Sequence, residues 1–141
     1  MKIGYFITRN LLGLMFLVFG LNGFLHFLPM PMPTGLAGQY MTVLSASHYM
    51  VPVFLLQIIG GALLLANRYV PVALVLLGPV IVNILMYHTL MAPQGLPLAL
   101  IVTALFLFVF YSVRQAFAPI FTAQVHPEEP HTIAPPIGKL A

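Results

Sequence analysis

The chain has 141 residues, of which 61% are hydrophobic and only 5% are charged. Soluble domains carry roughly 25% charged residues, so this composition excludes an ordinary soluble domain and indicates a bilayer as the solvent. The net charge of +3 comes from isolated Lys and Arg residues, without the cluster that a nucleic-acid-binding protein needs for phosphate contacts. The absence of cysteine excludes disulfides, thiol redox chemistry and cysteine-bound metals.

Four apolar segments are long enough to cross a hydrocarbon core, which is about 30 Å thick and needs roughly 20 helical residues. We therefore expect an all-α membrane protein, in which residues 1–121 form a bundle of four transmembrane helices. The expected spans are residues 10–28, 49–66, 70–91 and 96–113. Residues 122–141 are rich in proline and contain both acidic residues, which predicts a flexible cytoplasmic tail.

The basic residues predict the orientation of the bundle. With four crossings, both termini and the turn at residues 67–68 lie on the same side, and all five Lys and Arg residues fall on that side. Lys and Arg are enriched in cytoplasmic loops of membrane proteins, so both termini are expected in the cytoplasm. The first apolar segment is longer than the roughly 7–15 residues of a signal-peptide core, which favours a retained span.

The loop expected on the outer side, residues 28–48, opens with three prolines that enforce an extended path. Apolar residues then recur at helical spacing, at Leu36, Tyr40, Val43 and Leu44. This pattern predicts a short amphipathic helix over residues 35–47 that lies on the outer surface. Such a helix either connects two spans and covers the bundle, or acts as a gating lid.

Polar side chains inside the spans give the candidate functional site, because such groups normally face the interior of a bundle. Asn22, Gln57 and Asn83 carry amides at similar depth, and histidines follow near the outer ends of the same spans. Asn22 and His26 have i, i+4 spacing and should lie one above the other, and Asn83 should share a helix face with Tyr87. The candidate ligand-binding residues are Asn22, His26, Gln57, Asn83, Tyr87 and His88.

Two other interpretations of these polar residues stay open at this point. The amides could serve only to hold the helices together through interhelical hydrogen bonds. His88 lies well round its helix from Asn83, so the sequence does not show whether the His88 side chain faces the same cavity. A metal site would need His26, His48 and His88 to converge from three segments, because no two have the spacing of a metal-binding pair on one helix. We therefore predict no metal site.

Catalysis by a carboxylate is also excluded, because Glu128 and Glu129 both lie in the tail. No catalytic residue is assigned, and the sequence leaves open whether the protein is an enzyme.

Three motifs resemble a known family: RNLLGLMFLVFGLNGF at residues 9–24, FLPMPMP at 27–33 and NILMYHTLMAP at 83–93. They are similar to the DoxX-like family of small bacterial inner-membrane proteins, over residues 9–117. The resemblance implies a four-helix bundle in the bacterial inner membrane, grouped with small quinone-associated or redox-linked proteins. One namesake relative is a subunit of a thiosulfate:quinone oxidoreductase. The family has no common catalytic set, so the resemblance implies no catalytic residue here.

The expected function is therefore that of a quinone-binding or redox-associated membrane subunit. Asn22, His26, Asn83 and His88 would donate hydrogen bonds to the quinone carbonyls, with a histidine as the proton partner. The expected partners are the lipid bilayer, a quinone, and either a redox protein or further copies of the chain. The alternatives are a non-enzymatic scaffold that binds partner proteins, and a small transporter, which the lack of an ionisable residue at mid-membrane disfavours.

Overall fold

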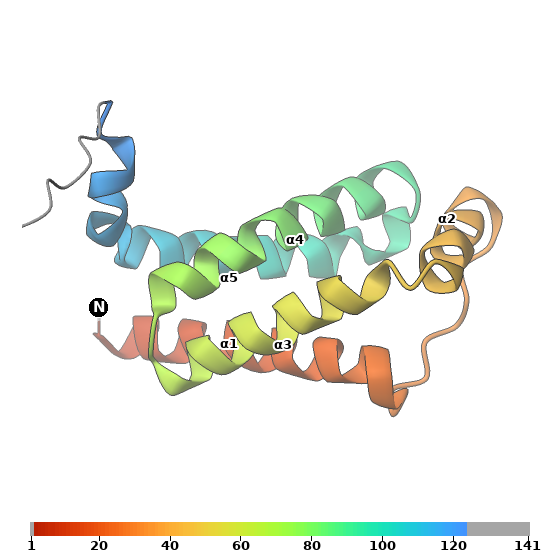
Figure 1. The fold of residues 1–141 in the computed structure, drawn as a ribbon, viewed down its shortest axis with the longest axis horizontal. Coiled ribbons are helices and arrows are strands. Elements are labelled where there is room, and N and C mark those ends of the chain that lie inside the picture. Colours follow the sequence, from red (N-terminus) through yellow and green to blue (C-terminus); the bar gives the residue numbers. More distant parts are fainter. Residues whose placement is uncertain (1, 124–141) are drawn as a thin grey trace, which may run out of the picture.

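The computed structural model describes residues 2–123, and these residues form helices and turns with no strand among them (Figure 1). Residues 124–141 of the expected tail lie outside the described part of the chain. The elements in chain order are α1 (Lys2–Leu25), α2 (Gly35–Ala46), α3 (Met50–Ala66), α4 (Val70–Leu90), the 3₁₀ turn η1 (Pro93–Gly95), α5 (Leu96–Ser112) and the 3₁₀ segment η2 (Arg114–Phe121).

The four long helices α1, α3, α4 and α5 lie side by side as a bundle (Figure 1). The most extensive interface joins α1 and α3; α4 packs between α3 and α5, and α5 closes the ring against α1. This arrangement confirms the predicted all-helical class.

Length and composition bear on how many of these helices can cross a membrane. Three helical segments are individually long and apolar enough: α1, α4 and the η1–α5 unit. Helices α2 and α3 pass the same test only as a pair that is bent by 86°, which raises the number of candidate spans to four. The described helices are compatible with an integral membrane protein that crosses the bilayer several times.

Helix α1 differs from the predicted span at residues 10–28, because it runs from Lys2 to Leu25. The charge of Arg9 was expected to mark the membrane boundary, but Arg9 lies inside the helix and is only 3% exposed. At the other end the helix stops because His26 adopts a left-handed backbone conformation with φ of 52°. The other three bundle helices agree with the predicted spans to within one residue at each end.

Glycines allow α1 and α3 to approach each other closely. A Cβ atom added to Gly61 would lie 2.7 Å from the carbonyl oxygen of Gly13 and 2.7 Å from the backbone nitrogen of Leu17. On α1, a Cβ at Gly20 or Gly23 would likewise collide with α3. The glycines of α1 and α3 are therefore close-packing sites between the two helices.

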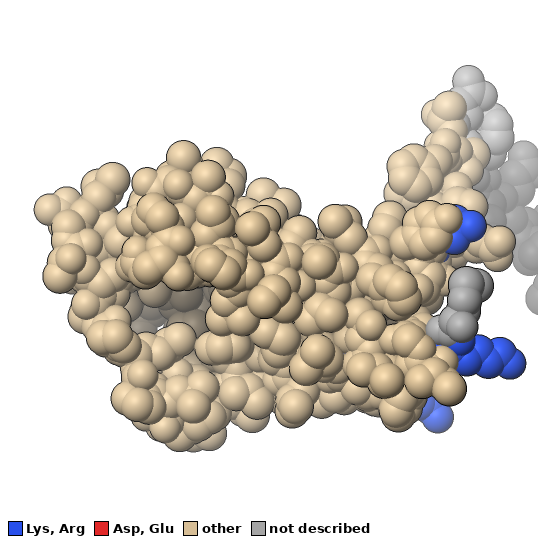
Figure 2. Space-filling model, turned by 180° about the vertical axis from the view of Figure 1, so that it is seen from behind, with Lys and Arg blue, Asp and Glu red and all other residues tan. Residues whose placement is uncertain are grey.

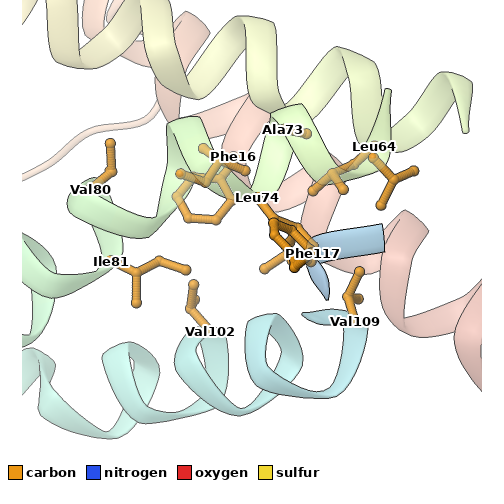
Figure 3. Packing of buried hydrophobic residues seen from close by; sticks show 12 residues of the cluster. Phe16, Leu64, Ala73, Leu74, Val80, Ile81, Val102, Val109 and Phe117 are labelled. Atoms are coloured by element: carbon orange, nitrogen blue, oxygen red, sulfur yellow. The ribbon is translucent and has the colours of Figure 1, made fainter. Parts of the chain in front are cut away.

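Apolar side chains from all four bundle helices form one core cluster, shown in Figure 3. Leu12, Leu64, Leu77 and Val109 are fully buried within it. Phe117, on η2, closes the cluster at one end by packing against Phe110 with 4.9 Å between ring centroids.

The two ends of the bundle differ in charge. The Lys and Arg residues of the described chain lie at the end opposite α2, as Figure 2 shows, and we call this the basic end. No Asp or Glu occurs within residues 2–123. The gathering of Lys and Arg at one end of the bundle is the pattern from which both termini were expected in the cytoplasm.

Helix α2 lies across the opposite end of the bundle (Figure 1), which we call the α2 end. The predicted apolar face of this helix is only partly correct. Leu36 and Val43 are each 65% exposed, while Ala37 is buried. Tyr40 and Leu44 are half-buried. The inward face therefore follows Ala37, Tyr40 and Leu44, which have i, i+3, i+7 spacing.

Candidate functional site at the α2 end of the bundle

Each of the four bundle helices has a last buried residue toward the α2 end. The buried residue nearest to the α2 end is Asn22 on α1, Gln57 on α3, Ile81 on α4 and Ala99 on α5. Beyond these residues none of these helices has a buried side chain, and Figure 2 shows the surface hollowed at this end. We call the part of the four helices beyond these residues, which comprises residues 23–25, 50–56, 82–90 and 96–98, the vestibule.

Asn22 lies at the floor of the vestibule, but its amide is largely engaged by the chain itself. The Leu28 N–H donates to Asn22 Oδ1 at 2.6 Å, and Asn22 Nδ2 donates to the Leu28 carbonyl at 3.4 Å. The side chain is 6% exposed. Asn22 therefore fixes the path of the chain after α1, which is the local capping role that Asn often has.

His26 lies one turn above Asn22, because its N–H donates to the Asn22 carbonyl at 2.9 Å, but its ring is exposed whereas Asn22 is buried. The helix ends at Leu25, and the left-handed backbone of His26 turns the chain away from the helical path. The His26 ring is exposed, and its Nδ1 lies 3.1 Å from the Phe24 carbonyl. Since a carbonyl only accepts, Nδ1 carries the proton and Nε2 remains an acceptor in the neutral ring.

Gln57 is the second amide at the floor of the vestibule, and it has no partner. Its side chain is 8% exposed and makes no hydrogen bond to any residue in the described chain. It lies against Gly20 of α1, where an added Cβ would come within 3.0 Å of Gln57 Cβ. Arg9 Nε is the one fully buried side-chain polar atom without a partner in the described chain, so the Gln57 amide atoms keep some access to the surface. An unpaired amide with such access makes Gln57 the strongest candidate ligand-binding residue.

Asn83 points away from the vestibule, contrary to the prediction that it lines the same cavity. The buried face of α4 runs through Leu77, Val80 and Ile81. At 100° per residue, Asn83 lies about 130° round the helix from that face, and it is exposed. The polar side chain that continues the buried face is His88, seven residues after Ile81.

His88 and Tyr87 lie where α4 ends and the chain turns into α5. His88 is half-buried, and its Nδ1 lies 3.0 Å from the Ala92 carbonyl. Nδ1 is therefore the donor, which leaves Nε2 as an acceptor in the neutral ring. The ring packs against Gly95 of η1. Tyr87 packs edge-on against His88, with 5.0 Å between ring centroids, and stacks on Tyr40 of α2 at 5.9 Å.

Two further results concern residues outside this group. Arg9 is buried at the basic end and donates to the carbonyls of Leu64 and Leu65. Its single positive charge in an apolar run is the only signal that could have indicated this role.

His48 is exposed at the corner between α2 and α3. No group of three metal-ligating side chains occurs within residues 2–123.

Comparison of the chain with protein-family models, with curated proteins and with solved structures finds no match. The chemistry of the side chains in the vestibule therefore indicates which kind of molecule it can bind. The amide of Asn22 is largely engaged by the Leu28 backbone, the amide of Gln57 makes no hydrogen bond to a described residue, and the imidazole of His88 has a nitrogen that can accept. This set suits a small apolar molecule with one or two hydrogen-bonding groups.

Proposed function

We propose that the chain is a four-span protein of the bacterial inner membrane, with DoxX-like character and both termini in the cytoplasm. We further propose that it binds a quinone in the vestibule as a redox-associated membrane subunit. The observation that supports this proposal is the Gln57 side chain, which is only 8% exposed and whose amide makes no hydrogen bond to a described residue but keeps some access to the surface. Polar groups inside membrane spans are expensive and commonly mark binding sites.

In the four-span arrangement α3 crosses the membrane as a span of its own. It packs along α1 over the most extensive interface in the bundle, and its 17 residues extend about 25 Å at 1.5 Å per residue. Helix α2 then lies near the outer surface, where its exposed Leu36 and Val43 would contact lipid.

The chemistry of the amide suits both redox states of a quinone. The Gln57 NH₂ group can donate to a quinone carbonyl, and its carbonyl oxygen can accept from the hydroxyl of the reduced form. His88 Nε2, which the Nδ1 contact to Ala92 leaves unprotonated in the neutral ring, can accept the proton of a second hydroxyl. These two residues replace the larger predicted set, because Asn22 is occupied by Leu28 and Asn83 faces outward.

The test is extraction of the purified protein with organic solvent, followed by mass spectrometry for quinones. Gln57→Leu removes the amide, keeps the volume and leaves a residue suited to a buried site. Gln94→Leu is the matched control, because Gln94 is exposed in η1. We expect near-stoichiometric quinone in the wild type and in Gln94→Leu, and its loss in Gln57→Leu. A wild-type protein that contains no quinone contradicts the proposal.

A non-enzymatic scaffold is the second candidate function, favoured by the hydrogen bonds of Asn22 to Leu28. In that case the polar residues only stabilise the fold. Asn22→Ala would then lower the amount of folded protein in the membrane, and neither Asn22→Ala nor Gln57→Leu would change any bound small molecule.

A further inference from the structure

Asn83 is a polar side chain on a part of α4 that no other element of the bundle covers. It is exposed and makes no hydrogen bond to any described residue. Its neighbours on this surface are apolar and exposed: Val75 and Val82 are each 56% exposed and Met86 is 55% exposed. Asn83 is therefore a single amide in an otherwise apolar outer face.

The depth of Asn83 makes this exposure unfavourable. It is seven residues from the end of α4 at Leu90, which corresponds to about 10 Å along the helix axis. If α4 crosses a hydrocarbon core about 30 Å thick, the amide lies in the acyl-chain region. There is no water there to satisfy its donors and acceptor.

Pro79 adds a second unsatisfied group to the same ridge. Proline has no N–H, so the Val75 carbonyl loses its i+4 partner within α4. Val75, Pro79 and Asn83 have i, i+4, i+8 spacing and form one inclined row on the helix surface. The row therefore contains a carbonyl without its i+4 donor and an amide without a described hydrogen-bond partner, within an apolar surface.

We propose that this α4 face, defined by Val75, Pro79, Val82, Asn83 and Met86, binds a second copy of the chain. The amide of Asn83 would pair with its counterpart in that copy. A two-fold axis along the membrane normal places identical residues at identical depth. An amide is also self-complementary, because it has both donors and an acceptor. Two copies related in this way satisfy both amides, whereas lipid satisfies neither. The inference does not depend on the vestibule or on its ligand.

Cross-linking in native membranes tests the interface, because the natural chain has no cysteine. Met86→Cys places a thiol on the proposed face. Ile101→Cys is the control, because Ile101 is 55% exposed on α5, a few residues from the α2 end. Mild oxidation should give disulfide-linked dimers of Met86→Cys and not of Ile101→Cys. Equal cross-linking at both positions, or none at either, overturns the proposal.

The role of the amide is tested by light scattering on the full chain in mild detergent. Asn83→Leu should lower the dimer association constant roughly tenfold, the scale of an interhelical hydrogen-bond pair. Asn83→Gln should restore most of the association. Because Asn83 is exposed, neither change should alter the helix content by circular dichroism. A wild type that is monomeric, or an Asn83→Leu variant that associates as tightly as the wild type, overturns the proposal.

Discussion

Arg9 on α1 donates a hydrogen bond to the backbone carbonyl of Leu64 in the last turn of α3. The same guanidinium nitrogen lies 3.3 Å from the carbonyl of Leu65. Carbonyls at the end of a helix have no i+4 partner, and together they carry a partial negative charge. A cation from the neighbouring helix therefore caps α3, and this bond fixes how the two helices meet at the basic end.

Replacing Arg9 should destabilise this contact between α1 and α3. Arg9→Met keeps most of the volume but removes the charged donor, so we expect the free energy of unfolding to fall by about 1.5–3 kcal/mol. Thermal unfolding in detergent measures the change. Arg114→Met is the control, because Arg114 is exposed and bonds only to Tyr111 in its own turn. Unchanged stability in Arg9→Met would mean that the cost of burying the guanidinium cancels the capping interaction.

The close approach of α1 and α3 predicts opposite effects for two Gly→Ala changes. Gly61→Ala places a methyl group 2.7 Å from the backbone of α1, and such overpacking costs about 1–3 kcal/mol. At Gly78 the nearest atom to an added Cβ is on Phe106, 3.9 Å away. Gly78→Ala should therefore stabilise α4 by about 0.5–1 kcal/mol. Equal melting temperatures for the two variants would contradict the packing described above.

Asn22 should control the segment that follows α1. Asn22→Ala removes both bonds to the Leu28 backbone, and the Leu28 N–H then loses its only partner in the described chain. We expect amide hydrogen exchange at Leu28 to accelerate by roughly tenfold, which corresponds to about 1 kcal/mol. Asn22→Asp keeps the acceptor and should leave this amide protected. Fast exchange at Leu28 in the wild type would argue against the capping role.

The imidazole of His88 should have its proton on Nδ1 when it is neutral. The acceptor is the Ala92 carbonyl at 3.0 Å, and a carbonyl cannot donate. Nitrogen-15 NMR of histidine-labelled protein distinguishes the two neutral tautomers. His48, whose ring makes no hydrogen bond to a described residue, is the internal control. A neutral His88 with its proton on Nε2 would remove the acceptor that the quinone proposal assigns to the vestibule.

The helices themselves were predictable from sequence, because hydrophobic length and flanking turns determine them. The predicted spans at residues 49–66, 70–91 and 96–113 agree with α3, α4 and α5. The helix that contains the first predicted span begins at Lys2 rather than at Asn10, and no sequence pattern shows that Arg9 is buried within it. Only the folded structure shows that the carbonyls of α3 compensate its charge.

The candidate site was predicted less well, because the rotation of each helix about its axis and single local hydrogen bonds decide which side chains meet. The similar depth of Asn22 and Gln57 follows from helix lengths, and both lie in the outermost buried layer. The direction of Asn83 depends on which arc of α4 packs against α3 and α5, and the nearly uniform hydrophobicity of α4 conceals that arc. The end of α1 at Leu25 depends on a bond between Asn22 and the backbone six residues later, which no periodic pattern indicates.

The absence of Asp and Glu from residues 2–123 has a consequence for behaviour in acid. Acid denaturation mostly reflects protonation of carboxylates that are paired in the native state. Residues 2–123 contain no carboxylate side chain that acid could protonate. The Arg9 and Asn22 contacts use backbone carbonyls and amide groups, which do not titrate in this range. Protonation of His88 would leave its Nδ1–H in place on Ala92. The polar contacts that shape the bundle should thus persist at low pH.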